Sequence, residues 1–216
     1  MSTGPDERGT RIASPIPATV DLSIPAGIAL SVRRGVAELG PDLLVEEDRV
    51  RRLAELAPVL AEAIGRRGRR VEYQMLNGVR RAQDSGLQDL PLRYELTIMG
   101  GRPIGSEAAK TYGHVHVRPP GARFGYPEVV EIVHGEAGFL IQDLSTSPVG
   151  PMSSVAWLVR AKAGDWVVLP PELAHVTIDL GAGPLVFSDV IDRRATGIYR
   201  GVGEAAGFAW YVGRDG

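Results

Sequence analysis

Two histidines separated by one residue, His114 and His116, form the part of the sequence best suited to chemistry. Side chains alternate across a strand, so histidines at i and i+2 project from one face and can hold one metal ion together. Glu128 and His175 complete a site of three imidazoles and one carboxylate if neighbouring strands bring them in. Glu131 is the competing carboxylate, but the same alternation places it on the opposite face from Glu128.

Glycine and proline near these residues favour a built site. Gly113 permits close backbone approach beside the histidine pair, and Gly135 ends the strand that begins at Glu128. The run Gly164–Pro170 is typical of a strand that ends in a turn, and His175 follows five residues after its proline. The His-x-His pair is weak evidence alone, because two histidines on a polar face can instead be satisfied by hydrogen bonds.

Short β-strands dominate the chain after residue 70. Many short strands at this spacing indicate a sandwich or barrel. The pattern predicts strands at Val71–Leu76, Leu92–Met99, Lys110–Val117, Glu128–Val133, Gly138–Asp143, Ser154–Arg160, Asp165–Leu169, His175–Leu180 and Leu185–Ile191, with an edge strand at Phe208–Val212.

The first third of the chain has a different pattern. Apolar residues recur at three- and four-residue spacing over Glu46–Arg66, which predicts a helix that Pro58 kinks. A short helix is also expected at Ser31–Glu38. The sequence therefore divides into a disordered tail at 1–14, an N-terminal extension with a helix at 15–70 and a β-barrel at 71–216.

Composition narrows the class of protein. A length of 216 residues suits one domain with an extension, and a net charge of −2 argues against a general nucleic-acid binder. The absence of cysteine excludes disulfides and thiolate metal sites. No apolar run approaches the roughly 20 residues that cross a bilayer, and the polar N-terminus lacks an apolar signal core. We expect a cytoplasmic protein that does not bind membranes.

The motifs around the histidines resemble those of the cupin superfamily over about Lys110 to Asp189. The first cupin motif has His-x-His, a carboxylate and a glycine seven residues later; the second has glycine, proline six residues on and histidine five after that. Two departures are a longer loop between His116 and Glu128, and Asp179 where asparagine is usual. The resemblance implies a mainly β fold, the cupin double-stranded β-helix or jelly-roll barrel, with a short N-terminal helical extension.

A narrower resemblance, to the cupin-type phosphoglucose isomerases first described in archaea, covers about Val71 to Gly207. The matching residues are Thr97–Gly105, Lys110–His116, Glu128, Pro170–His175 and Tyr199 ahead of Gly207-Phe208. In that family the matching three histidines and glutamate hold one divalent metal ion, commonly iron, manganese, nickel or zinc.

The same resemblance implies roles for other residues. Thr97, Thr111 and Gly113 match residues near the sugar phosphate. Apart from the resemblance, Lys110 beside Thr111 is expected to help these residues hold the phosphate. Tyr199 and Tyr73 match tyrosines that line the pocket. Two departures concern the sugar: the family's Glu-x-Tyr is Glu128-Val129-Val130 here, and a histidine just before the late tyrosine is absent.

The predicted function is a metal-dependent aldose–ketose isomerase that interconverts glucose 6-phosphate and fructose 6-phosphate. In this reaction the metal stabilises the enediolate. Glu128 moves a proton between C1 and C2, and Tyr199 donates a hydrogen bond to a sugar oxygen. A hydride shift from one carbon to the other is the alternative to proton transfer. Alternatives are a cupin isomerase or epimerase for a different sugar phosphate, a metal-dependent cupin dioxygenase, and a non-enzymatic cupin sensor. Because cupins often pair through strand edges, a homodimer is expected, with tryptophans in the core or at its contact.

Overall fold

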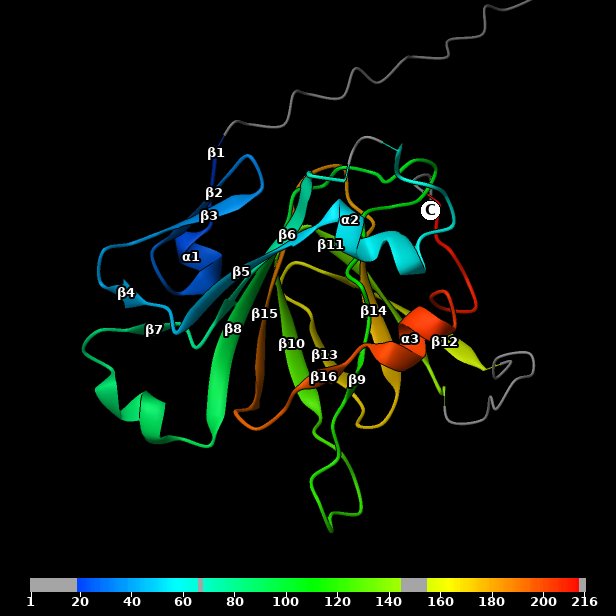
Figure 1. The fold of residues 1–216 in the computed structure, drawn as a ribbon. Coiled ribbons are helices and arrows are strands. Elements are labelled where there is room, and N and C mark those ends of the chain that lie inside the picture. Colours follow the sequence, from blue (N-terminus) through cyan, green and yellow to red (C-terminus); the bar gives the residue numbers. More distant parts are fainter. Residues whose placement is uncertain (1–18, 66–67, 145–154, 214–216) are drawn as a thin grey trace, which may run out of the picture.

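Two antiparallel sheets face each other in the computed structural model and form the predicted barrel (Figure 1). The structure describes residues 19–65, 68–144 and 155–213, so the tail predicted to be disordered at 1–14 lies outside the described residues. The larger sheet contains, in spatial order, β13 (Trp166–Leu169), β10 (Glu128–His134), β15 (Leu185–Asp192), β8 (Leu92–Met99), β6 (Val71–Asn77) and β5 (Glu47–Arg52). The smaller sheet contains β12 (Ala156–Lys162), β11 (Glu136–Gln142) and β14 (Ala174–Asp179).

Apolar side chains from both sheets meet between them and form the main core. Phe139 and Leu140 of β11 lie in one cluster with Val130 and Ile132 of β10, and all four are buried. The tryptophans do not contribute to this core, because Trp157, Trp166 and Trp210 are all exposed. Part of the barrel interior is left polar, and that part holds the site described below.

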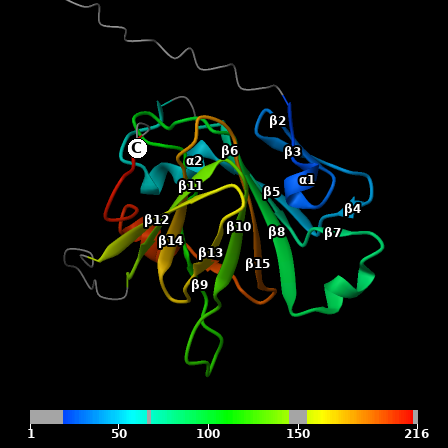
Figure 2. The same cartoon turned by 180° about the vertical axis from the view of Figure 1, so that it is seen from behind.

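The N-terminal extension covers the outer face of the larger sheet (Figures 1 and 2). Leu30 and Val32 of the extension pack against Leu96 and Ile98 of β8 in a second apolar cluster. Its elements are β1 (Thr19–Asp21), α1 (Ser23–Ala26), β2 (Leu30–Arg33), β3 (Val36–Leu39) and β4 (Leu43–Leu44), which pairs with β7 (Arg80–Arg81). Side chains alternate along β8, so Glu95 and Thr97 face the barrel interior instead.

The helix predicted over Glu46–Arg66 is wrong. Its first part is β5, which pairs antiparallel with β6 as the edge strand of the larger sheet, and only two short turns follow, α2 (Leu53–Leu56) and η1 (Ala57–Val59). Leu53 and Leu56, which share a face at helical spacing, are both buried. The helical spacing of apolar residues therefore applies to one helical turn, α2. Residues 47–52 form a strand instead, because they pair with β6 at the edge of the larger sheet.

Other differences concern short segments. The helix expected at Ser31–Glu38 is instead the β2–β3 hairpin. The strand predicted at Lys110–Val117 reduces to β9 (Val115–His116), which pairs with β16 (Gly197–Ile198), although isolated bridges also join Lys110 and His114 to β14. The strand expected at Phe208–Val212 does not form within the described residues. The remaining helices are η3 (Ser85–Asp89) and α3 (Arg200–Glu204).

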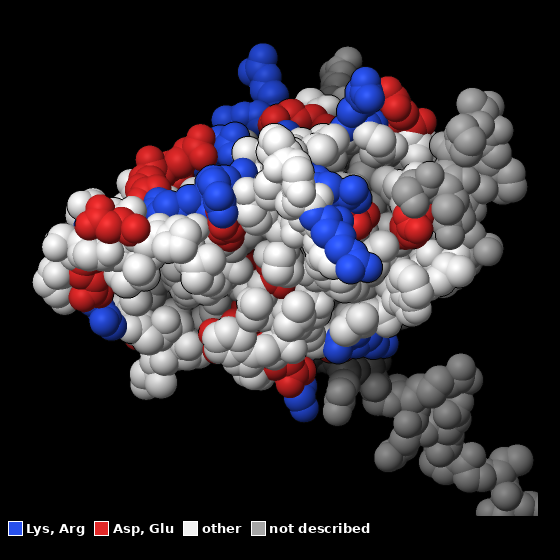
Figure 3. Space-filling model, turned by 90° about the horizontal axis from the view of Figure 1, so that it is seen from below, with Lys and Arg blue, Asp and Glu red and all other residues white. Residues whose placement is uncertain are grey.

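Neither the distribution of surface charge nor the length of the helices points to a particular function. Lys and Arg are interspersed with Asp and Glu on the face shown in Figure 3, as the near-zero total charge leads one to expect. In the described part of the chain, none of the helices has the length and apolar character needed to span a membrane.

Asp179, where cupins usually have asparagine, is a buried charge that we predict to cost stability. Its Oδ1 accepts the Gly181 N–H at 3.0 Å, whereas its buried Oδ2 makes no hydrogen bond with any described residue. Burial raises the pKa of Asp179 to about 7. The folded state therefore holds this proton more tightly than the unfolded state, and stability falls as the pH rises from roughly 4 to 7.

Asp179→Asn is thus expected to raise the free energy of unfolding by about 1–2 kcal/mol at pH 8, with a smaller gain at pH 5. Urea denaturation at both pH values measures the difference. An equal gain at both, or a loss at pH 8, would contradict this account.

Candidate metal centre

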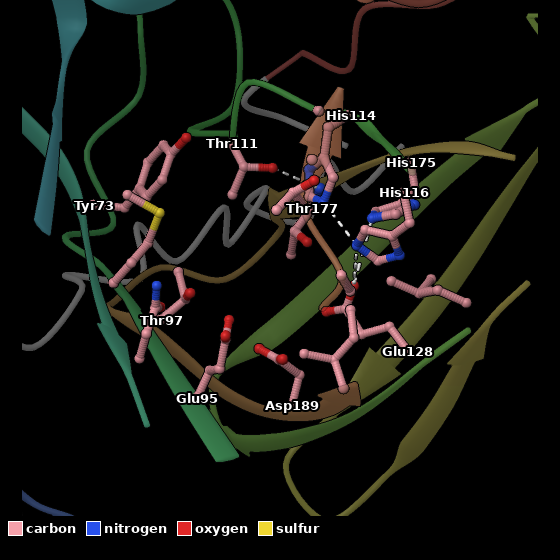
Figure 4. Close-up of a pocket in the computed structure, with 18 of the residues that line it drawn as sticks. Tyr73, Glu95, Thr97, Thr111, His114, His116, Glu128, His175, Thr177 and Asp189 are labelled. Carbon is pink, nitrogen blue, oxygen red and sulfur yellow. Dashed lines mark hydrogen bonds and ion pairs between the residues drawn. The ribbon is translucent and has the colours of Figure 1, made fainter. Parts of the chain in front are cut away.

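Backbone pairing places the imidazoles of His114 and His175 side by side. The amide of each residue donates to the carbonyl of the other at 3.0 Å, which joins the segment before β9 to β14. His116, two residues along, projects from the same face, as the alternation of a strand requires. Glu128 enters from the opposite sheet at the start of β10, and the four side chains converge in Figure 4.

The four potential ligand atoms of His114, His116, Glu128 and His175 lie within 4.8 Å of one another. Nε2 of His114 is 3.0 Å from Nε2 of His116. Glu128 Oε2 is 3.4 Å from His116 Nε2 and 3.5 Å from His175 Nε2. This cluster could hold a metal ion, and it contains the predicted ligand set.

Hydrogen bonds behind the imidazoles orient them toward one point. His116 Nδ1 lies 3.1 Å from the Tyr126 carbonyl oxygen, and His175 Nδ1 lies 3.2 Å from that of Leu173. A carbonyl oxygen only accepts, so the ring proton belongs on Nδ1 and the Nε2 lone pair points into the cluster. The buried Nε2 of His175 makes no hydrogen bond within the described chain. The inward-facing lone pair of His175 Nε2 receives no hydrogen bond from the described chain, and such a lone pair is suited to bind a cation.

Burial also shifts the protonation of these groups. It lowers the pKa of His175 to about 3, with the neighbouring His116 adding to the effect, and lowers the pKa of His114 well below its usual value. Burial raises the pKa of Glu128 to about 8, assisted by the charge of Glu95. The imidazoles are thus neutral at neutral pH, which is the form that binds a metal.

The metal cluster opens into a cavity of about 400 Å³ inside the barrel. The residues predicted to contact substrate all line it: Tyr73, Thr97, Thr111, Gly113 and Tyr199. The Tyr199 ring lies 5.3 Å from that of His114. The structure therefore places these five residues around one cavity with the metal cluster.

Glycine is required at position 113, because a side chain there would strain the backbone and clash with neighbouring atoms. Its φ of +82° lies in the left-handed region that favours glycine. A Cβ there would stand 2.5 Å from a ring carbon of Phe208 and 3.0 Å from the His175 carbonyl oxygen. The close approach expected beside the histidine pair is present.

Lys110 does not serve the cavity. Its Nζ donates to the Val59 carbonyl oxygen at 2.7 Å and pairs with Glu107 Oε2, also at 2.7 Å, so the predicted help in binding phosphate is wrong. The cavity instead contains Arg51 of β5, which the sequence analysis assigned to a helix. Its Nε is buried without a hydrogen-bond partner in the described structure, and its Cζ lies 5.2 Å from the centre of the Tyr199 ring.

Two carboxyl groups of the cavity wall, the half-buried Glu95 and the buried Asp189, were also missed. They are direct partners across the β8–β15 pair. Burial raises the pKa of each, most strongly that of Asp189, where Glu128 and Glu95 add to the effect. Strand alternation places Glu95 on the same face as Thr97, but the sequence does not specify the register between β8 and β15.

Comparison with known proteins decides the family. The model of the glucose-6-phosphate isomerase family matches residues 50–216, which include every residue of the metal cluster and cavity named above. This chain belongs to the glucose-6-phosphate isomerase family. It is of the cupin type, as the resemblance predicted. A search of curated proteins found no match.

The solved structures that this chain matches share little of its sequence. Peruvianin-I, a cysteine peptidase from Thevetia peruviana latex, is 19% identical over 56% of this chain and 61% of its own, with a TM-score of 0.39. A vicilin from Solanum melongena is 14% identical over 58% and 30% of the two chains (TM-score 0.42). Oxalate decarboxylase from Bacillus subtilis is 16% identical over 59% and 28% (TM-score 0.39). This chain therefore spans less than two thirds of each, and the family assignment does not depend on them.

Proposed function

We propose that this isomerase interconverts glucose 6-phosphate and fructose 6-phosphate with one divalent ion of iron, manganese, nickel or zinc. His114, His116, His175 and Glu128 would hold the ion. The observation that carries the proposal is the convergence of three neutral imidazoles and a carboxylate at the wall of a cavity. When bound, the ion would supply Lewis-acid stabilisation of the negative charge that develops on the sugar oxygens.

Glu128 and Tyr199 would handle protons in this reaction. Glu128 Oε2 would take the proton from C2 or C1 and return it to the other carbon, with an enediolate between the two transfers. Its burial, which raises its pKa, favours a carboxylate that can both accept and release a proton near neutral pH. The Tyr199 hydroxyl would donate to a sugar oxygen.

The phosphate would lie at the end of the cavity beside β5 and β6. A phosphate dianion needs a cation. Lys110 is occupied, and two other arginines that line the cavity are paired: Arg49 with Glu47, and Arg93 with Glu95. Arg51 has a long 3.3 Å contact with Glu55, a hydrogen bond with the neutral Tyr73 side chain and an unpartnered Nε, so no carboxylate holds it closely.

Neighbouring groups complete this phosphate site. Tyr73 stands opposite Arg51 across the β5–β6 pair. Its hydroxyl accepts the Tyr112 N–H at 3.3 Å, and burial raises its pKa to about 12, which leaves its own proton free to donate. Thr97 and Thr111, with the Gly113 amide, would add neutral contacts.

Arg51→Ala is expected to raise the KM for fructose 6-phosphate about 10- to 100-fold with a much smaller change in kcat, since it removes charge-assisted hydrogen bonds worth roughly 1.5–3 kcal/mol. Steady-state kinetics on the metal-loaded enzyme measures both constants. Arg160→Ala, an exposed arginine of β12, makes the same change in net charge as a control. A KM within twofold of wild type in Arg51→Ala would contradict the assignment.

A coupled assay tests the proposed reaction. Protein stripped of metal is supplied with fructose 6-phosphate, glucose 6-phosphate is detected, and each of the four ions is restored in turn. Turnover that depends on the ion is expected. No turnover with any ion would remove this substrate pair.

A second candidate keeps the site and changes the sugar. Val130 stands where the family has a tyrosine and is fully buried in the core, so this chain lacks that hydroxyl two residues from Glu128. An isomerase or epimerase for another sugar phosphate is therefore the alternative. A panel of sugar phosphates can be incubated with the protein in deuterated water and observed by NMR. Loss of the C1 or C2 proton signal of one compound would identify that compound as the substrate.

The expected homodimer also remains a proposal. Trp166 and Val168 of β13 are exposed, as are Trp157 and Val159 of β12. These strands are the edges of the two sheets, and burying them in a second copy would protect both edges. Sedimentation should then give twice the 23.1 kDa chain mass.

A further inference from the structure

A pair of carboxyl groups occupies the cavity wall beyond the metal cluster. Asp189 of β15 and Glu95 of β8 are direct cross-strand partners and point into the same part of the cavity in Figure 4. Carboxylates directly opposite each other on neighbouring strands repel. Their side-by-side placement therefore costs stability unless another group uses them.

Within the described residues, Glu95 is the member of this pair that is held by a direct ion pair. Arg93 Nε forms an ion pair with Glu95, while the other nitrogens of Arg93 donate to the carbonyl oxygens of Arg193 at 2.8 Å and Ala195 at 3.2 Å. Asp189 is 5% exposed. The charge of Arg93 attracts it, but its carboxyl makes no hydrogen bond with a described residue. A buried polar group without a partner is costly, so Asp189 is available to a ligand.

The pair lies within reach of a substrate held at the metal cluster. Asp189 also stands opposite Val130 on β10, and Glu128 is two residues before Val130 on the same face. Diagonal neighbours of this kind are roughly 7–8 Å apart. Val130 is smaller than the tyrosine of the family and carries no polar group, whereas Asp189 and Glu95 both line the cavity.

We propose that Asp189 and Glu95 form a subsite for the hydroxyl groups on the middle carbons of the open-chain sugar. Carboxyl oxygens accept hydrogen bonds from hydroxyls, and a buried site built to do so rejects an analogue that lacks the hydroxyl. The subsite would thus decide which sugar phosphate the enzyme accepts. The inference rests on the proposed function for its substrate class.

Binding of polyol phosphates tests the subsite separately from turnover. Metal-loaded protein is titrated calorimetrically with sorbitol 6-phosphate and with its 3-deoxy and 4-deoxy analogues. Wild type is expected to bind the full polyol at least about tenfold more tightly than one of the deoxy analogues. In Asp189→Ala the ratio should shrink to about twofold or less. Asp189→Asn, which keeps the shape, serves if the alanine variant does not fold, and should also reduce the ratio.

Glu131→Ala removes a carboxyl from the same sheet on the face away from the cavity and should leave the ratio unchanged. A wild-type protein without preference, or an unchanged ratio in both Asp189 variants, overturns the inference. Fructose 6-phosphate turnover, measured on the same wild-type sample, reports on the proposed function by itself. The two ideas can therefore fail independently.

Discussion

His116→Ala is expected to abolish stoichiometric metal binding and, with it, isomerase turnover. His116 Nε2 faces both His114 and Glu128, and its ring is fixed from behind by the Tyr126 carbonyl. Loss of an outer-shell partner alone typically costs 10- to 100-fold in metal affinity, so loss of the ligand should cost more than about 100-fold. Elemental analysis after dialysis measures the metal content, and circular dichroism checks the fold.

His134→Ala is the matched control for this experiment. His134 is the histidine at the end of β10 outside the metal cluster, so its removal should leave one metal ion per chain. A folded His116→Ala protein that retains a full equivalent of metal would rule out the proposed centre.

Glu128→Gln is expected to lower kcat by about 10²- to 10⁴-fold, the usual contribution of a general acid–base group. Glutamine keeps the size of the side chain and an oxygen ligand but cannot carry the proton. Metal content should therefore fall less than in His116→Ala, while kcat collapses. Steady-state kinetics and elemental analysis on one sample separate these effects.

Solvent deuterium identifies the step that Glu128 serves. Wild type should incorporate deuterium into the product if a proton is exchanged between C1 and C2, and Glu131→Gln should behave like wild type because Glu131 lies off the cavity. Product from wild type without deuterium, together with unchanged kcat in Glu128→Gln, would favour a hydride shift instead.

Much of the metal cluster was predictable because its signals are local. The i, i+2 spacing of His114 and His116 specifies one face of an extended segment, and strand alternation separates Glu128 from Glu131. The partner strands could not be derived from spacing. Only the resemblance to cupins joined His175 to the pair, through pairing that the structure shows directly between the His114 and His175 backbones.

The missed residues depend on pairing between distant segments. Arg51 was hidden because apolar residues at helical spacing follow it, although edge pairing with β6 makes β5 a strand. Asp189 and Glu95 become neighbours only through the β8–β15 register. Lys110 was misjudged because its sequence position beside Thr111 does not reveal that its side chain points to Glu107.

Anomalous diffraction from crystals of the metal-loaded enzyme tests the central claim most directly. Data collected on either side of the absorption edge of the added ion should give a single peak per chain. That peak should lie about 2.0–2.2 Å from Nε2 of His114, His116 and His175 and from a carboxylate oxygen of Glu128. A peak elsewhere in the barrel, or contact with fewer than three of these side chains, would contradict the account.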